Sequence, residues 1–142
     1  MFLKRLRKLQ GKQMEKKICD LPILTVETLL SEKISQPTFR DDLIDALLAA
    51  QLPASSRAVH CIAVIIDFEN TKETSLRQQK AERIIKIFID KTSNFHVDGI
   101  PSALEKQLLN SQFQALIEVK NHLIKDLATL SVTKRVILSN ID

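Results

Sequence analysis

Apolar side chains recur three or four positions apart through most of the chain, and no segment gives a clear strand signal. A recurrence of 3.6 residues is typical of an amphipathic α-helix. We expect residues 131–138 to continue the helix with the clearest such pattern, which covers residues 111–130. Its apolar positions are Phe113, Leu116, Ile117, Leu123, Ile124, Leu127 and Leu130. The whole pattern predicts an all-α fold with six to eight helices.

Two helices are predicted before residue 53. Thr25 is expected to cap a short helix over residues 25–33, and Pro37 opens a longer helix that Pro53 ends. Proline suits the first helical position because the N–H that it lacks would have no partner there. The apolar stripe of the longer helix consists of Phe39, Leu43, Leu47 and Leu48.

Residues 55–70 are ambiguous. The β-branched run over residues 59–66 is compatible with a buried strand, and periodicity alone does not distinguish that strand from a buried helix. The length of the segment and its serine caps favour the helix.

Two capping boxes mark the next helix starts. In a capping box, Ser or Thr is followed three residues later by Glu or Gln, and each side chain satisfies a free backbone N–H. Ser75 with Gln78, and Ser102 with Glu105, have this spacing. We expect helices after both serines and a loop over residues 89–101.

The N-terminal segment is strongly basic. Residues 1–17 hold seven Lys and Arg against one acid, a local charge of +6; since the whole chain carries +4, the other 125 residues carry −2. Residues 1–19 are predicted to form a basic amphipathic helix, and residues 20–142 a single helical domain. The helix either lies on an anionic membrane or packs on the domain. The candidate membrane-binding residues are Lys4, Arg5, Arg7, Lys8 and Lys12.

The composition argues against several localisations and partners. No apolar run approaches the roughly 18 residues of a membrane span, and residues 1–20 lack the apolar core of a secretory signal. Cys19 and Cys61 form no CxxC pair, which fits a reducing compartment. Cys19 is also a candidate acyl acceptor, although a single cysteine does not establish lipidation. A slightly acidic body argues against nucleic-acid binding. We expect a cytoplasmic monomer.

The residues that build common active sites are missing. Two glycines exclude both the P-loop and the GxGxxG fingerprint. His60, His96 and His122 lie on separate elements without metal-ligand spacing. No catalytic residue, metal ligand or cofactor is therefore predicted. Asp41 and Asp45 share a helix face and could do acid–base work or hold a cation, but acids in a first helical turn usually only complement the helix dipole. His96 and Asp98 also suggest catalysis, but a lone histidine in a polar loop is more often a solvated side chain.

The order of these segments resembles the regulator of G-protein signalling (RGS) domain. "TVETLLSEKISQPTFRDDL" resembles the opening helices of that family, and "SSRAVHCIAVIIDFEN" resembles its central helix with an acid–aromatic pair. "KAERIIKIFIDKTSNFHVDG" resembles the next helix and loop, and "FQALIEVKNHLIKDLATLSVTKRVILS" the last helix. The resemblance covers about residues 20–140; each motif is loose, but their order is specific.

The resemblance implies an RGS-like bundle of about nine helices. In that family, loops grip the switch regions of a GTP-loaded Gα subunit and speed GTP hydrolysis. The Gα subunit supplies the catalytic arginine and glutamine itself. The domain stabilises the transition-state conformation, which is catalysis by differential binding. The resemblance thus implies a regulator without an active site of its own.

The resemblance also assigns a Gα-binding face, residue by residue. The family's S-E-x-N loop falls on residues 55–58, its second-loop asparagine on His96, and the following acid on Asp98. In the last helix its leucine is kept as Leu127, and its basic residue as Arg135. The assigned face is Ser55, Ser56, Arg57, Ala58, His96, Asp98, Leu127, Ser131, Val132 and Arg135.

Most polar residues of that face differ from the family's pattern, which makes GTPase activation doubtful. Each lost partner in a desolvated polar contact costs about 1–3 kcal/mol. The expectation is therefore a regulator that binds activated Gα at the inner face of the plasma membrane or in the cytoplasm. The alternative is a non-catalytic RGS-fold adaptor for another signalling or trafficking protein.

Overall fold

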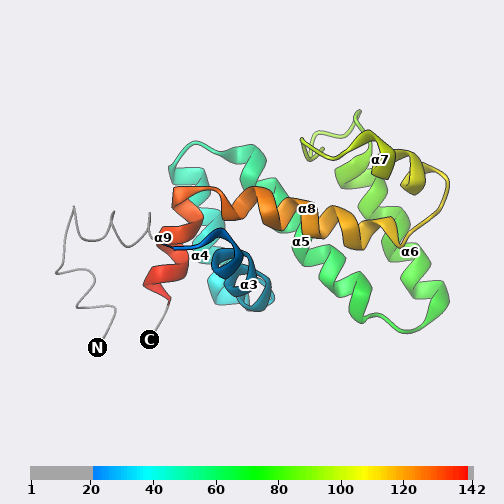
Figure 1. Ribbon diagram of the computed structural model, residues 1–142. Coiled ribbons are helices and arrows are strands. Elements are labelled where there is room, and N and C mark those ends of the chain that lie inside the picture. Colours follow the sequence, from blue (N-terminus) through cyan, green and yellow to red (C-terminus); the bar gives the residue numbers. More distant parts are fainter. Residues whose placement is uncertain (1–20, 141–142) are drawn as a thin grey trace. The chain divides into compact units, whose positions relative to one another are not determined.

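The computed structural model describes residues 21–140. Over this range the chain forms seven α-helices and one π-helical turn, without a strand, which confirms the all-α class (Figure 1). The nine-helix count is not confirmed. No helix in this range has the length and apolar character needed to cross a bilayer. The predicted basic helix, its candidate membrane-binding lysines and arginines, and Cys19 all lie outside the described residues.

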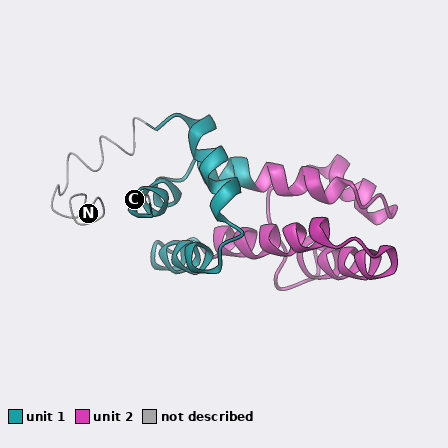
Figure 2. Cartoon of the chain, turned by 90° about the horizontal axis from the view of Figure 1, so that it is seen from below, with its two compact units in different colours: residues 1–52, 124–142 teal, residues 53–123 magenta. Residues whose placement is uncertain are grey.

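The described chain divides into two compact units (Figure 2). Residues 53–123 form one unit, and the described residues before and after them form the other. We refer to them as the central unit and the terminal unit.

The terminal unit is built from α3 (Ile23–Lys33), α4 (Pro37–Ala49), residues 124–128 of α8 (Ala115–Ala128) and α9 (Ser131–Ser139). Helix α9 packs against both α3 and α4 (Figure 1). Apolar side chains at helical spacing fill the space between these helices, because burying them removes apolar surface from water. The buried residues include Val26, Leu30, Phe39, Leu43, Leu47, Val136 and Ile137.

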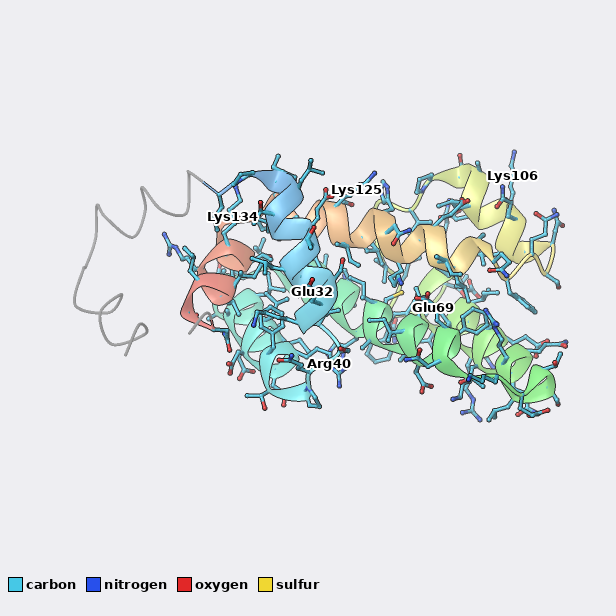
Figure 3. The ribbon with its side chains drawn as sticks, turned by 60° about the horizontal axis from the view of Figure 1, so that its bottom comes forward. Glu32, Arg40, Glu69, Lys106, Lys125 and Lys134 are labelled. Carbon is cyan, nitrogen blue, oxygen red and sulfur yellow. The ribbon has the colours of Figure 1, made fainter. Side chains whose placement is uncertain are left out.

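Helix α4 begins at Pro37, as predicted. The guanidinium Nη1 of Arg40, a residue labelled in Figure 3, donates a hydrogen bond to the Ile34 carbonyl at the end of α3, 3.4 Å away. Leu48 was predicted to be part of the apolar stripe, but it is 51% exposed. It directly follows the buried Leu47, and adjacent residues on a helix do not share a face.

Two predictions about helix ends in the terminal unit are wrong. Helix α3 begins at Ile23, with Pro22 as its N-cap, so Thr25 lies inside the helix. Residues 131–138 do not continue the preceding helix, since Leu130 takes an extended conformation (φ −82°, ψ 132°) and α9 starts after it. The Thr129 hydroxyl donates to the Asp126 carbonyl at 2.7 Å, a local bond that competes with helix continuation.

The central unit contains α5 (Pro53–Asn70), α6 (Thr74–Ile84), the π-helical turn η1 (Ile85–Ile89), α7 (Ser102–Leu109) and residues 115–123 of α8. Helix α5 packs on α6, and η1 packs on α7. The helical interpretation of residues 55–70 is confirmed. The buried positions of α5 follow helical spacing because one face of the helix covers the core: Ala58, Val59, Cys61, Ile62, Ile65 and Phe68.

Ion pairs join the helices of this unit. Glu69 on α5 pairs with Lys120 on α8, and Figure 3 labels Glu69. Lys80 on α6 lies 2.9 Å from the Asp67 carboxylate and donates to the Thr71 hydroxyl at 2.8 Å. Both lysines thus pair with carboxylates near the C-terminal end of α5.

Neither predicted capping box forms the N-terminal cap of its helix. The carboxylate of Glu73 caps α6 by accepting from the backbone N–H groups of Ser75 and Leu76, so the cap lies two residues before Ser75. Gln78 instead donates to Glu82 at 3.2 Å. Helix α7 begins at Ser102, but its N-cap is Pro101, which makes no side-chain hydrogen bond.

Candidate partner-binding surface

The candidate surface consists of two segments of the central unit. The first segment is the first turn of α5, residues 53–58. The Ser56 hydroxyl donates to the Pro53 carbonyl at 2.8 Å. Ser56 and Ala58 are buried and do not offer the surface expected of them, because they lie on the core side of α5. Ser55 and Arg57 are half-buried and reach the surface.

The second segment starts from the π-helical turn η1. The backbone N–H of Asp90 donates to the Ile85 carbonyl at 2.8 Å, a bond five residues back that closes a wider turn than an α-helix does. Such turns occur mostly as single insertions in α-helices and frequently at functional sites. The turn ends at Asp90, which is extended, and the chain leaves the helix there.

Short-range hydrogen bonds organise the start of the following loop, residues 90–101. The Asp90 carboxylate accepts from both the backbone N–H and the hydroxyl of Thr92, at 2.9 and 2.8 Å. These two bonds lower the pKa of Asp90, and the nearby His96 lowers it further. Ser93 then bonds twice with the next residues: its hydroxyl accepts from the Phe95 N–H at 3.1 Å, and its carbonyl from the His96 N–H at 3.3 Å.

The middle of the loop is attached to the core. The backbone N–H of Val97 donates to the Phe88 carbonyl in η1 at 2.9 Å, and the Val97 side chain is buried. Gly99 has a φ of 82°, a conformation that glycine adopts without a steric penalty. The loop therefore has a fixed path although it contains no regular secondary structure.

His96 and Asp98 are neighbours, as the sequence suggested. The His96 Nδ1 lies 3.5 Å from the Asp98 carboxylate, with side-chain exposures of 22% and 73%. That separation is longer than a charge-assisted hydrogen bond. The His96 Nε2 is buried and has no hydrogen-bond partner within the described residues. The pair resembles a loop contact more than an acid–base dyad.

Arg57 joins the two segments. Its guanidinium Nε donates to the His96 carbonyl at 3.3 Å, across 39 positions of sequence. The structure thus brings together Arg57, His96 and Asp98, three of the residues assigned to the face.

The other four assigned residues lie in the terminal unit. Leu127 is 2% exposed; it is a core residue, not the surface contact expected, because it lies on the buried side of α8. Ser131 and Arg135 are exposed near the start of α9, and Val132 is half-buried.

Nothing in the described range resembles a metal or thiol centre. No three His, Cys, Asp or Glu residues between 21 and 140 are placed to hold a metal ion. Cys61 is buried, and its burial raises the pKa of the thiol to about 12, so the reactive thiolate is scarce at neutral pH.

Sequence reasoning missed two features of the surface. The π-helical turn has no sequence signature that the apolar pattern reveals, because residues 81–88 show ordinary helical spacing. Phe95 lies in a polar loop and is 60% exposed. An aromatic side chain among polar loop residues was the available signal for this second feature.

Comparison with models of known protein families, with curated proteins and with solved structures gave no match.

Proposed function

We propose that this protein is a divergent RGS-type regulator that binds activated Gα through the first turn of α5 and the loop 90–101. The hydrogen bond from Arg57 to the His96 carbonyl carries the proposal. It joins two segments, far apart in sequence, that the resemblance assigns to a common Gα-binding face.

The proposed mechanism is stabilisation of one Gα conformation. A fixed loop that fits the switch regions best in the transition state lowers the barrier to hydrolysis without supplying a catalytic group. The ordered loop supports this role, because a surface that is already organised loses little entropy on binding. The regulator contributes no active site, metal or cofactor of its own in this proposal.

GTPase activation is proposed to be weak. Ser56 uses its hydroxyl within the first turn of α5, and the Arg57 Nε donates to the loop. These groups are therefore less available to a partner than the acid and asparagine that the family has there.

The reduced availability of the Ser56 and Arg57 side chains supports a second candidate, an RGS-fold adaptor without GTPase activation. Such an adaptor would bind another signalling or trafficking protein regardless of the nucleotide state of any Gα.

Two measurements on the full chain test these candidates. The first is single-turnover GTP hydrolysis by a panel of Gα subunits, and the second is Gα binding in the GDP and GDP–aluminium-fluoride states. Faster hydrolysis, or binding selective for the aluminium-fluoride state, supports the regulator. The absence of both effects across the panel would refute the regulator. Binding of another protein, independent of nucleotide state, supports the adaptor.

Peripheral membrane binding is a separate proposal, based on the +6 charge of residues 1–17. Each Lys or Arg near an anionic surface contributes about 1 kcal/mol. Vesicles containing phosphatidylserine should bind the full chain, and glutamine at Lys4, Arg5, Arg7 and Lys8 should release it. Unchanged binding by that variant contradicts the proposal.

A further inference from the structure

Phe95 is a large apolar side chain that the fold leaves in water. It is 60% exposed, and it is the one aromatic among the exposed large apolar residues between 21 and 140. Single exposed apolar residues are common, so its exposure alone does not indicate a function. Phe95 differs from such residues because it lies in the loop 90–101 and because hydrogen bonds hold the backbone on both sides of it.

The backbone around Phe95 is held on both sides. Its own N–H donates to the Ser93 hydroxyl, and the next residue is fixed by Arg57 through the His96 carbonyl. Two residues further on, Val97 is buried and bonded to η1. The backbone is thus fixed closely on either side of Phe95, yet the Phe95 side chain stays exposed.

This combination is typical of binding anchors. An aromatic ring supplies a large contact area with only two rotatable bonds, so fixing it costs little entropy. Most interface energy comes from a few such side chains that enter pockets on the partner.

The loop that carries Phe95 also holds two exposed carboxylates. Asp98 is 73% exposed, and Asp90 is exposed with a pKa below its usual range. The lowered pKa keeps the Asp90 carboxylate ionised at neutral pH. Two cations are associated with the loop: Arg57 is half-buried and bonded to it, and Lys91 lies 3.6 Å from the Glu105 carboxylate. Each therefore already has a partner within the central unit. A partner surface that accepts the ring is therefore expected to present positive charge.

We infer that Phe95 is the apolar anchor of the loop 90–101 and that it enters an apolar pocket with a basic rim on activated Gα. The inference rests on the proposed function and deepens it. Contact through the ring replaces part of the binding energy that the altered polar residues no longer supply. Asp98 pairs with the basic rim.

The test uses the full chain and a Gα in the GDP–aluminium-fluoride state, with the dissociation constant measured by calorimetry. Phe95→Ala should weaken binding by about tenfold or more, the usual size of a hot-spot effect, and Phe95→Leu by less. Asp98→Asn should weaken binding at low salt and have little effect at high salt, because salt screens exposed charges.

Leu109→Ala is the matched control. Leu109 is also apolar and is 71% exposed in the central unit, but it lies at the end of α7 and not in the loop. Its removal should leave the dissociation constant within about twofold, within the small change expected of a surface substitution. Thermal unfolding of each variant checks that the fold is intact.

The outcomes separate the two claims. If the wild-type chain binds no Gα of the panel, the proposed function fails and this inference fails with it. If wild type binds and Phe95→Ala binds equally well, the anchor is wrong while the proposed function stands. An equal loss in Leu109→Ala also overturns the anchor, because the effect would then come from general apolar attraction.

Discussion

The guanidinium Nε of Arg57 donates a hydrogen bond to the backbone carbonyl of His96, 3.3 Å away and 39 positions along the chain. One side chain from α5 thus fixes the loop that carries His96, Asp98 and the exposed Phe95. The bond holds these three residues in a defined arrangement. Mutations that remove it are therefore expected to alter the loop.

Arg57→Ala should loosen the loop without unfolding the central unit. A hydrogen bond of this kind contributes about 1 kcal/mol, so we expect a loss of stability near that value. Amide hydrogen exchange should accelerate at Phe95, His96 and Val97. Arg83→Ala, an exposed arginine of α6, is the control; similar exchange in both variants would contradict the assignment.

The Glu69–Lys120 pair should stabilise the central unit more than a surface ion pair does. Both side chains are half-buried, and leaving one partner unpaired there costs about 1–3 kcal/mol. A double-mutant cycle with alanine, measured by denaturant unfolding, gives the coupling energy. The control cycle uses Lys91 and Glu105, which are 3.6 Å apart with an exposed lysine; it should give less than about 1 kcal/mol. Equal couplings would refute the prediction.

The Asp90 turn should weaken in acid. The Thr92 hydrogen bonds lower the folded-state pKa of Asp90. A lowered pKa means that the stabilisation is complete above the unfolded value, about 3.9, and is lost as pH falls through the folded value. NMR titration of the Asp90 carboxyl measures this directly.

Thr92 offers a matched pair of variants for that titration. Thr92→Val removes the hydroxyl and leaves the backbone N–H, so the pKa of Asp90 should rise partway toward its usual value. Thr92→Ser keeps a hydroxyl and should leave the pKa lowered. An identical titration curve in Thr92→Val would show that the hydroxyl is not involved.

His96→Asn should raise any GTPase activation that the protein has. The resemblance places an asparagine at this position, and its amide both donates and accepts hydrogen bonds. Single-turnover hydrolysis by a responsive Gα is the measurement. His60→Asn, at an exposed position of α5, is the control. An unchanged rate in His96→Asn would mean that this side chain does not meet the switch regions.

Helix positions were predictable from the sequence where burial determines them. The length of the segment and its serines favoured a helix over residues 55–70 despite the β-branched run, and Pro37 identified the start of α4. Helix ends were less predictable, since several residues compete for each cap. Glu73, not Ser75, caps α6, and the extended conformation of Leu130 separates α8 from α9.

The site was only partly predictable because the sequence pattern does not give exposure. Ser56, Ala58 and Leu127 match positions of the assigned face, but each is buried. Asp98 is exposed and Arg57 is half-buried, and their place in a binding face stays a prediction. The bond between Arg57 and the His96 carbonyl involves the backbone of the loop, and no residue identity predicts it.

The π-helical turn has a consequence for insertions and deletions in this chain. Successive residues of an α-helix are rotated by roughly 100° about its axis. Deleting one residue between Ile85 and Ile89 would restore α-helical hydrogen bonding and rotate the exit of the chain by about that angle. The Phe88 carbonyl would then no longer face the Val97 N–H. The position of the loop therefore depends on the length of this segment.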